Sequence, residues 1–109
     1  MQIDFASSGG FANLELAYRA ETNTLSEEQA KELESLVESS GVFDLQQSEV
    51  TPEVTVGRAD IISYRIFVSD GSRQNTLWLN DITAPASVRP LLARLRKLAL
   101  EQKRKGPSS

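Results

Sequence analysis

Two turn signals, each set between segments of alternating apolar and polar residues, constrain this fold most strongly. They are Gly9-Gly10, between Met1–Ala6 and Asn13–Ala20, and Asp70-Gly71, between Ala59–Ser69 and Asn75–Asn80. Glycine adopts the positive φ angles that tight hairpin turns require. The sequence therefore predicts two β-hairpins. Apolar residues on both sides of the second hairpin predict that it lies at the centre of the sheet rather than at its edge.

Each predicted hairpin is followed by a segment with helical periodicity. Ser26 is placed to cap the first helix through the backbone amide of Gln29, and Gly41 is placed to end it. Pro85, Ser87 and Pro90 mark the start of the second helix. The order β-β-α-β-β-α predicts an α+β fold: a four-stranded, mainly antiparallel sheet with two helices on one face.

The open face of that sheet is expected to show polar residues together with one of two aromatic residues. They are Arg19, Ser63, Arg65, Thr76 and either Phe67 or Trp78. Between the hairpins, Gln46–Gly57 reads as a loop in which Val50, Val54 and Val56 allow a short strand, confined to an edge by Pro52. Residues 1–105 form one predicted domain, and residues 106–109 a flexible tail.

The chain of 109 residues contains no cysteine and no histidine, and this excludes several kinds of chemistry. Disulfides, thiolate metal sites and catalysis by Ser-His or Cys-His pairs are impossible. Three glutamates on the first helix are read as a solvated face, not as metal ligands, and three aspartates at strand ends as turn and capping residues. They are Glu32, Glu34 and Glu38, and Asp60, Asp70 and Asp81. We therefore expect no enzyme activity, no cofactor and no bound metal.

Basic residues crowd the C-terminal helix although the net charge is −3. They are Arg89, Arg94, Arg96, Lys97, Lys103, Arg104 and Lys105. Such a helix either binds nucleic acid or an acidic partner, or forms a solvated face that balances an acidic helix. We favour the solvated face, because no aromatic residues interleave with the basic ones. No apolar run is long enough to cross a membrane, and the N-terminus shows no secretory pattern, so we expect a cytoplasmic location.

The segment Ser7-Ser8-Gly9-Gly10-Phe11 places a bulky aromatic residue directly after a turn. Phe11 either closes the end of the hairpin within the core or projects as an anchor for a partner's pocket. Exposed aromatic residues at loop tips are typical of binding hot spots. The sequence leaves both interpretations open.

The chain resembles the emfourin family, small protein inhibitors of protealysin-type, thermolysin-like zinc metallopeptidases. The matching motifs follow in the family's order over nearly the whole chain. They are Ser8-Gly9-Gly10-Phe11-Ala12, the helix with Leu33, Leu36 and Val37, Phe43-Asp44-Leu45, Ala59-Asp60, Tyr64-Arg65-Ile66, Val68, Asp70-Gly71 and Arg89-Pro90-Leu91-Leu92.

This resemblance implies a monomer that reversibly blocks the active-site cleft of such a peptidase. The implied contact residues are Ser7, Ser8, Gly9, Gly10, Phe11 and Ala12, with the Gln46–Gly57 segment as a second contact. Phe11 would fill the apolar pocket beside the scissile bond. The alternative is a non-catalytic module that binds protein or nucleic acid through the open sheet face or the basic helix.

Overall fold

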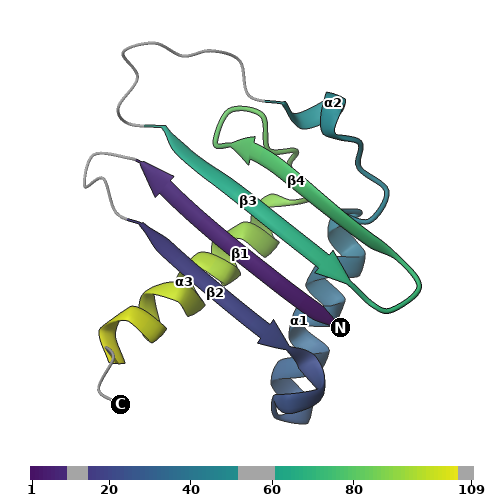
Figure 1. Ribbon diagram of the computed structural model, residues 1–109, viewed down its shortest axis with the longest axis vertical. Helices are drawn as coiled ribbons and strands as arrows, with labels where there is room; N and C mark the ends of the chain where they lie inside the picture. The colour runs from purple at the N-terminus through teal and green to yellow at the C-terminus, as the bar shows by residue number, and fades with distance from the viewer. Residues whose placement is uncertain (10–14, 52–60, 106–109) are drawn as a thin grey trace.

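A computed structural model describes residues 1–9, 15–51 and 61–105, which form a sheet layer and a helix layer (Figure 1). The elements are β1 (Gln2–Gly9), β2 (Leu16–Glu21), the short helix η1 (Thr22–Thr24), α1 (Glu27–Ser40), α2 (Gln47–Val50), β3 (Ile62–Ser69), β4 (Gln74–Asn80) and α3 (Arg89–Lys105). Helices α1 and α3 both lie behind the sheet in this view. The α+β class and the single helix-covered face are as predicted.

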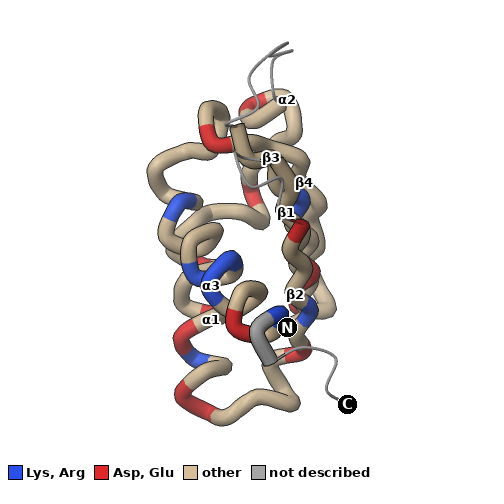
Figure 2. The backbone as a smooth tube through the Cα atoms, turned by 90° about the vertical axis from the view of Figure 1, so that its left-hand side faces the viewer, with Lys and Arg blue, Asp and Glu red and all other residues tan. Residues whose placement is uncertain are grey.

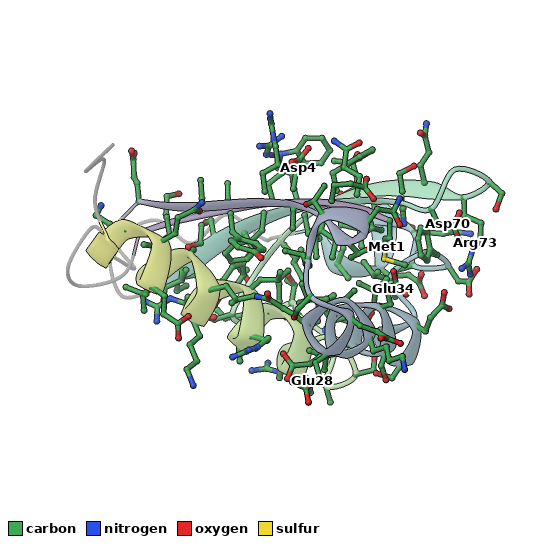
Figure 3. All side chains as sticks on the ribbon, turned by 90° about the horizontal axis from the view of Figure 1, so that it is seen from below. Met1, Asp4, Glu28, Glu34, Asp70 and Arg73 are labelled. Carbon is green, nitrogen blue, oxygen red and sulfur yellow. The ribbon has the colours of Figure 1, made fainter. Side chains whose placement is uncertain are left out.

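The four strands pair in the order β2-β1-β3-β4, and every neighbouring pair is antiparallel. Alternation along each strand divides the sheet into two faces, as the sequence predicts. Ile3, Phe5, Ile66 and Leu77 are at most 2% exposed and pack against the helices. Figure 3 shows Asp4 on the opposite, uncovered side, where its carboxylate accepts a hydrogen bond from Arg19 at 2.8 Å.

The ends of α1 follow the predicted capping. The Ser26 hydroxyl accepts a hydrogen bond from the Gln29 amide at 3.2 Å, which satisfies one free donor of the first turn. Gly41 follows the last turn with φ of 71°, the left-handed conformation that glycine adopts most readily. Leu33 and Val37 form the buried stripe of this helix. Local chemistry is therefore enough to set both ends of α1.

Strand β1 is longer than the alternating pattern indicates. We expected a strand over Met1–Ala6, yet it continues through Gly9. Ser7, Ser8 and Gly9 pair with the first residues of β3, so small residues with weak strand preference are held by backbone hydrogen bonds on the neighbouring strand. The first glycine of the predicted turn, Gly9, is therefore the last residue of the strand.

The position of β4 corrects the expectation that the whole second hairpin is central. Strand β3 is central, but β4 is an edge strand. The backbone N–H and C=O groups of Trp78 on this edge do not need a neighbouring strand, because the side chain of Gln47 forms hydrogen bonds with both. The Gln47 amide donates to the Trp78 carbonyl at 2.7 Å and accepts from the Trp78 amide at 2.9 Å.

Helix α2 corrects the expectation of an edge strand that includes Val50. Val50 ends this helical turn and is fully buried. The turn begins where the Glu49 side chain accepts a hydrogen bond from the Gln46 amide at 2.7 Å. Val54 and Val56, the other residues of that expected strand, lie outside the described residues, as do Pro52 and the tail of residues 106–109.

Candidate functional site

One end of the sheet brings together the described residues of the predicted contact segment. Strand β1 ends there at Gly9, β2 begins at Leu16 and β3 begins at Ile62 (Figure 1). In the register, Ser8 lies opposite Ser63 and Gly9 opposite Ile62. We call this region, Ser7–Gly9 with Leu16 and Ile62–Tyr64, the tip end of the sheet.

The described residues of the predicted site differ in their exposure. Ser7 faces the helices and is 5% exposed, whereas Ser8 lies exposed on the open face and Gly9 is half-buried. Gly10, Phe11 and Ala12 lie outside the described residues, so both interpretations of Phe11 remain predictions. The structure thus places Ser8 and Gly9 where a partner can reach them, with Ser7 beneath.

Gly9 is required by the backbone at the tip end. Its φ is 97°, a conformation that residues with a side chain rarely adopt. A Cβ atom at this position would lie 2.7 Å from the carbonyl oxygen of Ile61, closer than such atoms approach. Strain and close approach therefore both select glycine at the end of β1.

Asp81 anchors the start of β3, against which Gly9 pairs. The Tyr64 hydroxyl donates to Asp81 Oδ1 at 2.6 Å, and the Ile62 amide donates to Asp81 Oδ2 at 3.3 Å. The guanidinium of Arg89 in turn donates to the Asp81 carbonyl at 2.9 Å. Burial, and then the hydrogen bond to Asp81, raises the pKa of the Tyr64 phenol above its ordinary value. The predicted capping role of Asp81 is confirmed, but its bond to Tyr64 left no signal in the sequence.

The open face beside the tip end contains a shallow hollow of about 170 Å³. Its outer rim is formed by small side chains, one arginine and one aromatic ring: Ala6, Ser8, Ser63, Arg65 and Trp78. Trp78 is 53% exposed, which is unusual for so large an apolar side chain. The sequence named Phe67 or Trp78 for this face, and the structure exposes Trp78 while Phe67 is half-buried.

The groups available at this end suit binding to another protein. Within residues 1–9, 15–51 and 61–105, no group of three or more acidic residues is arranged to hold a metal ion. The chain has no histidine that could activate Ser7 or Ser8. Backbone edges, a tryptophan ring and an arginine are the groups with which one protein recognises another.

The basic helix is partly engaged with the acidic one, as the solvated-face interpretation predicts. Arg94 of α3 forms an ion pair with Glu32 of α1 at 2.6 Å. Figure 2 shows acidic positions along α1 and basic positions along α3, within the same layer. Glu38 pairs with Arg73, so two of the three glutamates that were predicted to form a solvated face form ion pairs with arginines. Among the described helices, none has both the length and the apolar character needed to span a membrane.

Comparison with known proteins gives one finding. The family model Emfourin matches residues 5–96, a range that runs from within β1 through the tip end and both strands of the second hairpin into the first half of α3. A search of curated proteins and of solved structures found no match. Because the family match covers most of the chain, this protein belongs to the Emfourin family, a family of metallopeptidase inhibitors.

Proposed function

We propose that this protein inhibits thermolysin-like zinc metallopeptidases of the protealysin type by reversibly blocking the active-site cleft with the segment that follows Gly9. Membership of the family supports the class of target. The observation that supports the mode of binding is the conformation of Gly9, the last described residue before this segment, whose positive φ and closeness to the Ile61 carbonyl leave no room for a side chain.

A well-anchored support for this segment matters because binding a flexible loop loses conformational entropy. A segment held in its bound geometry before association avoids much of that loss. The bond from Tyr64 to Asp81 and the contact of Arg89 with Asp81 fix the strand on which Gly9 rests. We propose that Phe11, projecting from this support, fills the apolar pocket of the peptidase next to the scissile bond.

The hollow on the open face supplies a second contact in this proposal. Trp78 and Arg65 lie beside Ser8 on the open face of the sheet. Tryptophan and arginine are the residues most enriched among binding hot spots. The rim of the cleft would therefore rest on the hollow while the tip enters the cleft.

Titration of a purified thermolysin-like peptidase with this protein tests the proposal, with cleavage of a short peptide as the readout. Activity should fall with added inhibitor, recover on dilution, and be protected by increasing substrate, because both compete for the cleft. Several such peptidases keeping full activity at high molar excess would contradict the proposal. Inhibition that substrate does not relieve would place the contact outside the cleft.

Nucleic-acid binding remains the alternative, and the structure gives it less support. Arg94 is committed to Glu32, and Arg96 has its Nε atom buried. If α3 bound nucleic acid, affinity for a DNA or RNA duplex would fall steeply with salt and fall further in Arg94→Gln. The inhibitor proposal expects only weak binding in that assay.

A further inference from the structure

A second recess lies on the helix side of the molecule, between α3 and the first residues of β3. Its volume is about 350 Å³, within the range of small-molecule sites. The polar groups that line it are Tyr64, Asp81, Arg89, Arg96 and Lys97. It lies on the opposite face of the sheet from the open-face hollow, because α3 packs there, and among the described residues Tyr64 is the one that lines both sites.

The charges in this recess are unbalanced. It contains three cations and one carboxylate, and the Asp81 carboxylate already accepts hydrogen bonds from Tyr64 and from the Ile62 amide. In the part of the chain that the structure describes, no ion pair within 4.0 Å involves Arg89, Arg96 or Lys97. A concave surface with excess positive charge attracts anions.

Arg96 supplies the more specific observation. Its Nε atom is buried, and it has no hydrogen-bond partner in the structure of the described residues. A buried donor without an acceptor loses its hydration and gains nothing in return, so a shift of the Arg96 side chain that brings Nε to an acceptor on a ligand would be favourable. The Nε–H and Nη–H groups of an arginine form a fork that matches the two oxygens of a carboxylate.

The other residues that line the recess are apolar, which favours a ligand with a hydrocarbon part. Leu92, Leu100 and two alanines of the same recess would contact a hydrocarbon group rather than further charge. We propose that this recess binds a small monocarboxylate with a short apolar chain. Its carboxylate lies on Arg96, with Arg89 and Lys97 nearby, and its chain lies against Leu92 and Leu100.

Direct binding of hexanoate to the full-length protein tests this proposal independently of any peptidase. Backbone amide NMR titration should shift signals of Tyr64, Asp81 and α3 residues, with a dissociation constant on the order of 1 mM, ordinary for so few atoms. Hexanol lacks the charge and inorganic phosphate lacks the chain, so both should bind at least about tenfold more weakly. Phosphate binding as tightly as hexanoate would overturn the assigned ligand class.

Substitutions test whether hexanoate binds in the recess around Arg96. Arg96→Gln should weaken hexanoate binding about tenfold or more, and Arg96→Lys should do so too, because lysine keeps the charge but loses the fork. Arg65→Gln, on the open face, is the matched control and should leave binding unchanged. Removing an unpaired buried donor should not lower stability, and thermal melting checks this. Equal effects of Arg65→Gln and Arg96→Gln, or no shift with hexanoate, would overturn the proposal.

Discussion

Gly9 joins the sheet to the segment that we propose enters the peptidase, and its backbone tolerates no side chain. Gly9→Ala should lower the free energy of unfolding by about 3 kcal/mol, because strain at positive φ adds to the clash with the Ile61 carbonyl at 2.7 Å. Urea unfolding with linear extrapolation measures this loss.

Gly71 provides the matched control for this substitution. Its φ is 96°, almost that of Gly9, but a Cβ atom there would meet nothing within 4 Å. Gly71→Ala should therefore cost only about 1 kcal/mol, the strain alone. Equal losses in the two variants would show that the close approach at Gly9 does not constrain the tip end.

Tyr64 gives the fold a dependence on alkaline pH. Its pKa is raised in the folded protein, so the folded chain keeps this proton at pH values where the unfolded chain has released it. Stability from this group is therefore complete below the ordinary tyrosine pKa of about 10 and is lost as pH rises above that value.

Tyr64→Phe should cost about 1 kcal/mol at pH 7, from the lost hydrogen bond to Asp81, and should lose less further stability between pH 9 and 11 than the parent. The pKa of Tyr18 is also raised by burial, so some alkaline loss should remain in this variant. Denaturant unfolding across this pH range is the measurement. Parallel pH profiles of parent and variant would contradict the assignment.

At the scale of elements, helix α2 protects the edge of the sheet through one side chain. Gln47→Ala removes both hydrogen bonds to the backbone of Trp78 and should cost about 1 kcal/mol. It also frees a strand edge beside an exposed tryptophan, so light scattering should reveal association at high concentration. Gln74→Ala, on the same strand, is the control and should show neither effect. Similar behaviour of both variants would mean that Gln47 does not protect the edge.

Elements defined by local chemistry could be predicted from the sequence, and those defined by distant contacts could not. Ser26 and Gly41 set the ends of α1 through neighbouring backbone groups, and Asp70 accepts from the Arg73 amide within its own turn. The hydrogen bonds that cover the outer edge of β4 come instead from Gln47, which lies 31 residues from Trp78 along the chain. Alternation alone does not distinguish a strand capped by a side chain from one that pairs on both sides.

At the scale of the whole molecule, the fold presents two differently built surfaces on its two faces. The open face carries the hollow beside the tip end, and the helix layer carries the recess around Arg96. The sequence predicted the uncovered face and its arginine and aromatic residue. It did not predict the recess, because that site forms only where α3 packs beside β3. The basic pattern of α3 suggested a solvated face, which holds for Arg94 but not for the buried Nε of Arg96.

Trp78 and Phe67 allow the second contact to be tested on one face of the sheet. Trp78→Ala should weaken inhibition about 30-fold, the effect of one interface hot spot of about 2 kcal/mol. Phe67 lies two residues beyond Arg65 on β3, away from the tip end. Phe67→Ala should therefore change inhibition less than about threefold. Inhibition constants against one thermolysin-like peptidase give both values. A larger effect at Phe67 than at Trp78 would move the contact away from the tip end.

The inhibition constant of Phe11→Ala, measured together with its free energy of unfolding, tests the central claim most directly. If Phe11 enters the peptidase cleft, inhibition should weaken about 100-fold or more while the free energy of unfolding changes by less than about 1 kcal/mol. Unchanged inhibition would contradict the claim. A loss of about 3 kcal/mol or more in stability would instead place Phe11 in the protein's own core.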